Sequence, residues 1–213
     1  MNDFKGFSQT DFDVFTIDGL DARMDALKSN IRPTFGVLAE RLTPMLSVLT
    51  KEEMFPHIAK HARRTVNPPS DTWIAWAADK RGYKKHPHFQ IGLWETHLFV
   101  WYAVIYESPF KQEIALAMQK NLKQIMKLIP DDFRWSPDHT DPMSKLQSEL
   151  GKKGVEQYIH RLQTVKKAEL LCGITIDRHD PVLTDGEKLM ARLEETLEIL
   201  SKLYLLCKPS VRV

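Results

Sequence analysis

Apolar residues in the first part of the chain recur at the spacing of helices. Leu20, Met24 and Leu27 lie three or four residues apart, and the same spacing continues over residues 31–49. The pattern predicts a helix over each stretch. Pro44 is expected to kink or end the second helix, because its ring opposes the carbonyl group four residues back.

The middle of the chain changes to the period of β-strands. Three short segments rich in aromatic and β-branched residues, 72–78, 88–94 and 96–106, are separated by turn residues. Apolar side chains alternate over 88–94, which predicts a strand with one apolar face. Residues 98–106 are apolar on both faces, which indicates a central strand that is covered on each side.

The last part of the chain mixes both periods. Four elements are expected there: a helix over 114–129, a helix around 155–162, a half-buried strand over 168–176, and a helix that starts with the Thr184-x-x-Glu187 capping box. Helices, then strands, then helices predict a single α+β domain over residues 1–213. Its sheet is expected to be mainly antiparallel and packed with helices.

Composition narrows the class of protein. The 213 residues suffice for one full hydrophobic core. The chain has 30 Lys and Arg and 28 Asp and Glu, so its net charge is too small to attract nucleic acid or a membrane surface overall. The longest apolar run is about half of the roughly 20 residues that cross a bilayer. Two cysteines make no disulfide framework, and the N-terminus lacks the pattern of a secretory signal. A cytoplasmic location and no membrane partner are therefore expected.

Common catalytic motifs are absent from the sequence. It contains no GxGxxG, GxxxxGK[ST], GxSxG or HExxH. These absences exclude the most frequent nucleotide-binding and hydrolase signatures. They leave open whether the protein is an enzyme, and which cofactor, if any, it uses.

One region is more basic than the rest of the chain. Residues 57–88 contain seven Lys and Arg but two Asp, a local charge of +5, with Trp73, Trp76 and Tyr83 interleaved. Basic groups neutralise phosphates and aromatic rings stack on bases, so the region predicts a site for an anionic, phosphate-bearing ligand or single-stranded nucleic acid. The alternative is a solvated hairpin tip. The two tryptophans are three residues apart and would lie on opposite faces of a strand, so at most one belongs to a binding face.

The stretch that follows, 86–109, extends this hypothesis. According to this hypothesis, arginine and lysine side chains bind a phosphate or carboxylate group of the ligand. Tyr83 or Trp94 stacks on the ligand, and His88 and Gln90 orient it. Gly92 is expected to leave a gap between Gln90 and Trp94 where a ligand or another backbone approaches. The predicted ligand-binding residues are Arg63, Arg64, Tyr83, Lys84, Lys85, His88, Gln90 and Trp94.

Two other functions stay open. A small acid–base enzyme would draw its groups from His88, Glu95, His97 or the segment 138–141, where Asp138, His139 and Asp141 lie close together, although Asp beside Pro is also ordinary turn chemistry. A protein-interaction module would use an apolar surface that the sequence does not locate.

Pairs of histidines suggest metal ligands less strongly. His57 and His61 are four residues apart, and His86 and His88 are two apart, but no third ligand stands at a recognisable spacing. No metal site is therefore predicted, and the oligomeric state is not indicated.

Four long segments carry a resemblance to a known family. FPHIAKHARRTVNPP, HFQIGLWETHLFVWYAVIYESP, IPDDFRWSPDHT and RLQTVKKAELLCGI resemble the YktB-like family of small proteins from Bacillus-type bacteria, over nearly the whole chain. The resemblance implies an α+β fold with an antiparallel sheet. It also suggests a loose similarity to the catalytic-domain topology of biotin ligases and class II synthetases, without their substrate-binding motifs. It carries no catalytic or binding residue over to this chain.

Overall fold

An antiparallel sheet organises the fold. The structure, a computed structural model, describes residues 4–208, and within them one seven-stranded sheet has the order β1-β2-β3-β4-β7-β5-β6 with every neighbouring pair antiparallel. The predicted α+β class is confirmed. The strands are β1 (Phe55–Ile58), β2 (Asp71–Ala77), β3 (His88–Trp94), β4 (His97–Val104), β5 (Arg134–Ser136), β6 (Lys145–Leu146) and β7 (Leu170–Asp177).

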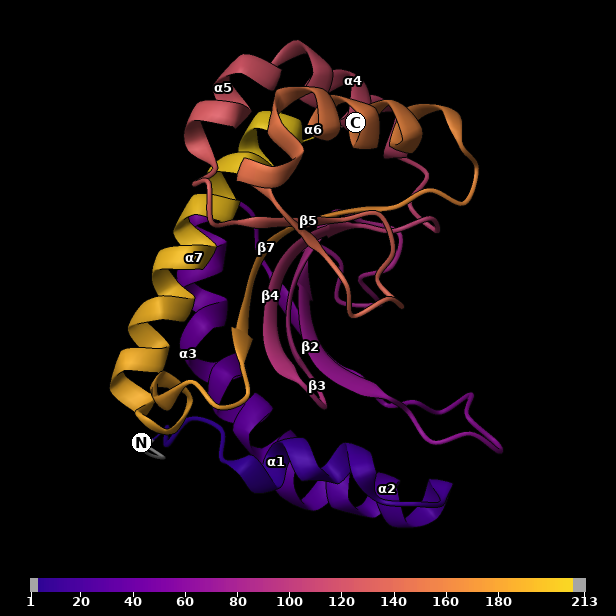
Figure 1. Cartoon of the computed structure of the whole chain (residues 1–213), viewed down its shortest axis with the longest axis vertical. Coiled ribbons are helices and arrows are strands. Elements are labelled where there is room, and N and C mark those ends of the chain that lie inside the picture. The colour runs from indigo at the N-terminus through magenta and orange to yellow at the C-terminus, as the bar shows by residue number, and fades with distance from the viewer. Residues whose placement is uncertain (1–3, 209–213) are drawn as a thin grey trace.

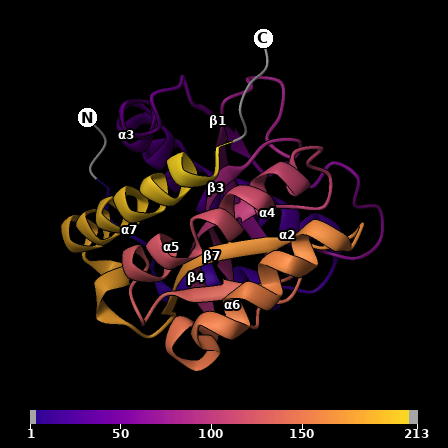
Figure 2. The same cartoon turned by 90° about the horizontal axis from the view of Figure 1, so that it is seen from above.

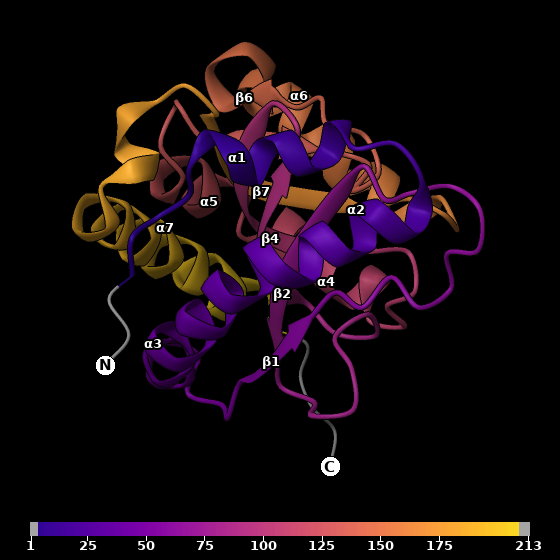
Figure 3. The same ribbon diagram turned by 90° about the horizontal axis from the view of Figure 1, so that it is seen from below.

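The helices occupy one face and both ends of this sheet. The two longest, α3 (Arg32–Thr50) and α7 (Gly186–Cys207), lie against one face (Figure 1). At one end of the strands lie α4 (Lys111–Lys120), α5 (Leu122–Leu128) and α6 (Gln147–Thr164) (Figure 2). At the other end lie α1 (Gln9–Asp13) and α2 (Leu20–Ala26) (Figure 3). Short turns of other helix types complete the set: η1 (Val14–Thr16), η2 (Leu27–Ile31) and η3 (Pro181–Thr184).

Side-chain alternation divides the sheet into a core face and a second face, here called the outer face. Trp76, Phe89, Ile91, Val100 and other apolar residues on the core face are fully buried. The outer face carries the side chains that alternate with them, because successive residues of a strand point to opposite sides. The outer-face residues include Asp71, Trp73, His88, Gln90, Trp94, His97, Phe99, Trp101 and Leu171. Trp73 and Trp76 therefore lie on opposite faces, as predicted.

Two glycines let aromatic rings lie against the outer face. Gly92 is paired with Phe99, and a Cβ atom at Gly92 would lie 2.3 Å from the Phe99 ring and 2.5 Å from the carbonyl oxygen of Thr72. Gly173 is paired with Trp101, and a Cβ atom there would lie 1.8 Å from the carbonyl oxygen of Val100. The expectation that Gly92 leaves a gap for a ligand is wrong, because the Phe99 ring fills that space.

Pro44 does not end α3, which was one of the two outcomes predicted for it. The helix runs on to Thr50, with Leu42 and Leu46 buried on either side of the proline. The preceding residue ties the helix to the sheet: the Thr43 hydroxyl donates to the Ala39 carbonyl at 2.6 Å and accepts from Trp76 Nε1 at 2.9 Å. Packing against the sheet therefore outweighs the missing backbone hydrogen bond.

Other boundaries also differ from the sequence pattern. The stripe predicted over 114–129 divides at Asn121 into α4 and α5. The last helix is capped by Asp185, whose side chain accepts from the Lys188 amide, rather than by Thr184. The strand predicted as half-buried, β7, is buried on both faces over most of its length, because the segment after β5 covers its outer side.

Both cysteines lie in the interior. Cys172 on β7 and Cys207 at the end of α7 are free thiols with no exposed surface. Burial raises the pKa of the Cys207 thiol to about 12 and raises that of Cys172 in the same direction. Among residues 4–208, no helix combines the length and the apolar character required to cross a membrane.

The glycine–aromatic contacts make a stability prediction. Gly173→Ala is expected to destabilise the protein by about 3 kcal/mol or more, because the new methyl group meets the backbone of β4, which cannot move aside. Gly36→Ala in α3 is the control. It meets no atom within 4 Å and is expected to stabilise the helix by roughly 0.5–1 kcal/mol. Urea denaturation of both variants measures the difference, and equal stabilities would contradict it.

Candidate functional site

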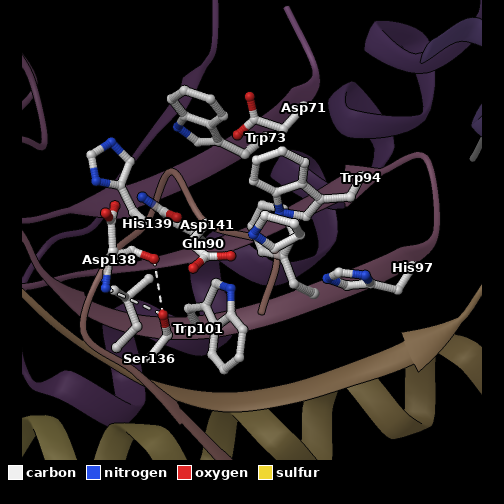
Figure 4. Close-up of a pocket in the computed structure, with 13 residues that line it drawn as sticks. Asp71, Trp73, Gln90, Trp94, His97, Trp101, Ser136, Asp138, His139 and Asp141 are labelled. Carbon is white, nitrogen blue, oxygen red and sulfur yellow. Dashed lines mark hydrogen bonds between the residues drawn. The ribbon is translucent and has the colours of Figure 1, made fainter. Parts of the chain in front are cut away.

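The outer face forms a narrow cleft beneath the segment that joins β5 to β6, residues 137–144. We call this the outer-face cleft. Its walls combine aromatic side chains with polar groups from the sheet and from that segment (Figure 4). Its cavity volume of about 10 Å³ suffices for roughly one water-sized group. The residues used below are Asp71, Trp73, Gln90, Trp94, His97, Trp101, Asp138, His139 and Asp141.

A buried carboxylate orients the one histidine that the covering segment contributes. Glu169, just before β7, is 4% exposed. One of its oxygens accepts from the backbone N–H of His139 at 2.9 Å and from its Nδ1 at 2.6 Å, and the other accepts from the Tyr106 N–H at 3.3 Å. The proton on Nδ1 is thereby fixed, which leaves Nε2 of His139 as the nitrogen that is free to take or give a proton.

The same contacts set the charge of His139. Burial lowers its pKa, but the hydrogen bond and charge of Glu169, with the charges of Asp71 and Asp138, outweigh burial and raise the pKa above 6.5. The shift favours the protonated, positively charged form of the imidazole.

Asp71 is a buried carboxyl group that, among residues 4–208, accepts a hydrogen bond from its own backbone N–H but from no other residue. It begins β2, lines the outer-face cleft and is 8% exposed. Burial raises its pKa to about 6, although the charges of His139 and Arg64 act in the opposite direction. An unpaired buried carboxylate is costly, which is why such groups concentrate at functional sites.

His88 and Gln90, two of the predicted residues, form a hydrogen-bonded pair at the edge of the cleft. His88 is fully buried, and its Nδ1 donates to the His86 carbonyl at 2.8 Å. Its Nε2 therefore accepts from the Gln90 amide at 2.9 Å. Burial lowers the pKa of His88 to about 4, so the ring is neutral. His88 positions Gln90 rather than touching a ligand, and the amide oxygen of Gln90 is the group that remains for the cleft.

The groups proposed for an acid–base enzyme partly converge. Asp138, His139, Asp141 and His97 all line the outer-face cleft, with Asp138 and His139 on one side and His97 on the other (Figure 4). Burial and the charge of Arg134 lower the pKa of His97 to about 4, so His97 is neutral at pH 7. Glu95 is exposed and does not line the cleft.

The basic residues form a second cleft, which we call the basic cleft. Arg63, Arg64, Tyr83 and Lys84 line it together with Lys60 and Trp73. The Tyr83 hydroxyl accepts from Trp73 Nε1 at 3.0 Å, and Lys84 pairs with Glu107 at 3.0 Å. Lys85 lies in the adjoining hollow with Lys84 and Arg81. The eight predicted ligand-binding residues therefore do not share one site. Gln90 and Trp94 line the outer-face cleft, Arg63, Arg64, Tyr83 and Lys84 line the basic cleft, Lys85 lies in the adjoining hollow, and His88 packs against Tyr83.

The early histidines do not converge on a metal. His57 Nε2 bonds to the Asp79 carbonyl at 2.9 Å, and His61 Nε2 bonds to the Thr72 hydroxyl at 3.1 Å. The two imidazole rings therefore bind different protein groups and do not point to a shared ligand.

Asp138, His139 and Glu169 are the metal-ligand candidates that the described residues offer, with donor atoms within 4.8 Å of one another. A tetrahedral ion holding Nδ1 of His139 and the Glu169 oxygen would separate them by about 3.4 Å. They lie 2.6 Å apart, which suits a shared proton instead.

Sequence reasoning missed three important residues: Asp71 and Trp101, which line the outer-face cleft, and Glu169, which bonds to His139. Asp71 and Glu169 each stand at the start of an apolar strand, and Trp101 lies inside one. An acidic residue directly at the start of an apolar strand could have indicated a functional residue. Such a residue is expected to be buried with the strand, whereas the acidic residues of a surface turn are exposed. Pairing across strands 71–77, 88–94 and 97–104 was needed to bring them together.

Asp71 makes a pH-dependent stability prediction. Its folded pKa of about 6 exceeds the ordinary 3.8, so its ionisation penalises the folded state. The penalty is absent below pH 3.8 and complete above pH 6. Asp71→Asn is therefore expected to stabilise the protein at pH 8 by on the order of 2–3 kcal/mol, and by little at pH 3.5. Urea denaturation across this range measures the effect. Asp18→Asn, at an exposed position, is the control, and a pH-independent gain for Asp71→Asn would contradict the prediction.

Comparisons with known proteins agree with the family resemblance of the sequence. Residues 7–204 match the family model described as Domain of unknown function (DUF1054). A UPF0637 protein from Bacillus velezensis is 52% identical over 200 residues, covering 94% of this chain and 95% of the relative. UPF0637 proteins from Bacillus licheniformis and Bacillus cereus are 52% and 50% identical, covering 93% and 94% of this chain and 94% and 97% of each relative. Because the match spans nearly the whole chain, the protein belongs to the DUF1054 family, whose relatives here carry the name UPF0637.

Proposed function

We propose that the outer-face cleft binds a small molecule and that His139 moves a proton on it. The observation that carries this proposal is the pair formed by His139 and the buried Glu169 at 2.6 Å. A carboxylate bonded to Nδ1 fixes the tautomer of an imidazole and stabilises its protonated form, so the opposite nitrogen serves as general acid or base.

The surroundings of this pair support the assignment. The pKa of Asp71 is raised to about 6 and that of His139 is raised above its ordinary value, and both residues line the same cleft. Titratable groups with shifted pKa values that share a cleft are typical of an acid–base site. Trp73, Trp94 and Trp101 give the cleft an apolar wall that holds a ligand and excludes water.

The test is turnover that depends on His139. A mixture of small metabolites is incubated with the protein, and mass spectrometry identifies compounds that it consumes. His139→Gln is expected to reduce consumption by roughly 10²- to 10⁴-fold, and Glu169→Gln by roughly 10- to 100-fold through loss of orientation. His160→Gln, at an exposed position on α6, is the matched control and is expected to match the unmodified protein. No consumption, or consumption that survives His139→Gln, contradicts the proposal.

A second candidate function belongs to the basic cleft. We propose that it binds a phosphate-bearing ligand, since Lys60, Arg63, Arg64 and Lys84 surround a single hollow beside Tyr83. Arg63 and Arg64 are exposed, so their donors are available to an anion. Such charge-assisted bonds weaken as salt rises.

Binding of pyrophosphate tests this candidate. Calorimetry at low salt is expected to detect pyrophosphate binding. The affinity is expected to fall by roughly 10-fold in the Arg63→Ala and in the Arg64→Ala variant, because each loses about one hydrogen bond to a charged group. Lys153→Ala, at an exposed position on α6, provides the control for net charge. Equal affinity of the Arg63→Ala and Lys153→Ala variants would exclude the basic cleft.

A further inference from the structure

The outer-face cleft is acidic, in contrast to the basic region that dominates the sequence. Asp71, Asp138 and Asp141 line it, and within residues 4–208 no Lys or Arg side chain does. His97 is held neutral by burial. Arg64, which belongs to the basic cleft, influences Asp71 by its charge, but no hydrogen bond joins the two. The cleft therefore attracts positive charge and repels anions.

Asp71 is the strongest single indication that the cleft binds a cation. More than nine-tenths of the residue is buried, and within residues 4–208 its carboxyl group accepts from its own backbone N–H and from no other residue. Buried carboxylates are normally paired with a cation or with several hydrogen-bond donors. Gln90 contributes an amide oxygen farther along the cleft, because it pairs with Ala75, four residues along β2 from Asp71, and its NH₂ group is already bonded to His88. Acceptors thus outnumber donors in the cleft.

The remaining walls suit an organic cation rather than a hydrated metal ion. Trp73, Trp94 and Trp101 line the same cleft. Indole faces attract ammonium groups through the electrostatics of the ring, and they pack against the attached alkyl carbons. The cavity of about 10 Å³ has room for a group about the size of a water molecule. A primary ammonium group has that size, whereas a quaternary one is much larger.

We propose that the outer-face cleft binds the primary ammonium group of a small organic amine, with Asp71 as its counter-ion and the tryptophans as the aromatic wall against which it packs. This inference rests on the proposed function, because it names the class of ligand on which His139 acts. The alkyl chain leaves the cleft past the segment 137–144, which carries exposed residues over the opening.

The groups around Asp71 give the interaction a defined pH dependence. Protonation of Asp71 below about pH 6 removes the counter-ion. Protonation of His139, from the covering segment, adds a positive charge that repels the ligand, and Arg64 from the β1–β2 connection is positive throughout. Both titrations act in the same direction, so amine binding weakens as the pH falls from 8 to 5.

The experiment compares three ligands of one shape and different charge: butylammonium, butanol and butyrate. The readout is the set of indole N–H signals in nitrogen–proton NMR spectra of the five tryptophans. Butylammonium is expected to shift the signals of Trp73, Trp94 and Trp101. It leaves Trp76 and Trp135 unchanged, since both are fully buried elsewhere. Tetramethylammonium is expected to produce no shift at the same concentration.

Variants locate the charge that is responsible. Asp71→Asn is expected to weaken butylammonium binding by roughly 10-fold or more, and this variant should fold because it removes a destabilising charge. Asp132→Asn is the matched control. Its carboxylate is exposed and lies 3.7 Å from Arg192, outside the cleft. Equal affinity in the two variants overturns the proposal.

Other outcomes separate this inference from the proposed function. Shifts produced equally by butanol or butyrate overturn the assignment of charge, while the cleft remains a ligand site. Shifts produced by zinc but not by butylammonium overturn it in favour of a metal at Asp138, His139 and Glu169. Binding of a lysine-containing peptide without binding of butylammonium overturns the small-molecule assignment. If none of these ligands shifts the three cleft tryptophans, both proposals fail.

Discussion

The register of the central strands is the constraint on which the rest of the structure depends. Antiparallel pairing of β2, β3, β4 and β7 sets Asp71 beside Trp94, and Gln90 beside Trp101. A slip by one residue would turn every side chain of a strand to the opposite face. The cleft would then lose its polar groups and the core would gain them. The apolar core face, packed against α3 and α7, excludes that alternative.

This register gives the two faces different tasks. The core face contributes apolar burial, and the outer face carries groups that the fold by itself does not need. Glu169 is buried and bonded to His139, while Asp71 is buried and bonded, within residues 4–208, to its own backbone N–H alone. A chain selected for stability alone would have no use for an ionisable group in that position. Asp71 is therefore more informative about function than the many exposed charges, which any surface tolerates.

The elements of the fold were largely predictable from the sequence. Alternation located β3 and β7, because each side of a strand has a constant environment, and the richness in aromatic and β-branched residues located β2 and β4. Boundaries were less accurate. Pro44 and Asn121 show why: tertiary packing continues α3 through a proline, and it divides α4 from α5 although the apolar stripe is continuous.

The candidate site was only partly predictable. His139, Asp138 and Asp141 were noticed because they are close in sequence, and Gln90 and Trp94 because they share a strand face. Glu169 lies 30 residues from His139, and Asp71 lies in a different strand from Gln90. No local pattern links such residues, since only the strand order β2-β3-β4-β7 places them together. The basic segment attracted attention through composition, but composition does not reveal that an acidic cleft lies on the other side of Trp73.

The positions of the two cysteines have a practical consequence for following the segment 137–144. Both thiols are buried, and burial holds them in the unreactive protonated form, so native protein presents no thiolate to an alkylating label. A single cysteine placed at the exposed Met143 would therefore react alone. A dye or spin label there would report on the surroundings of the segment when a ligand is added, without any need to remove the natural cysteines from the core.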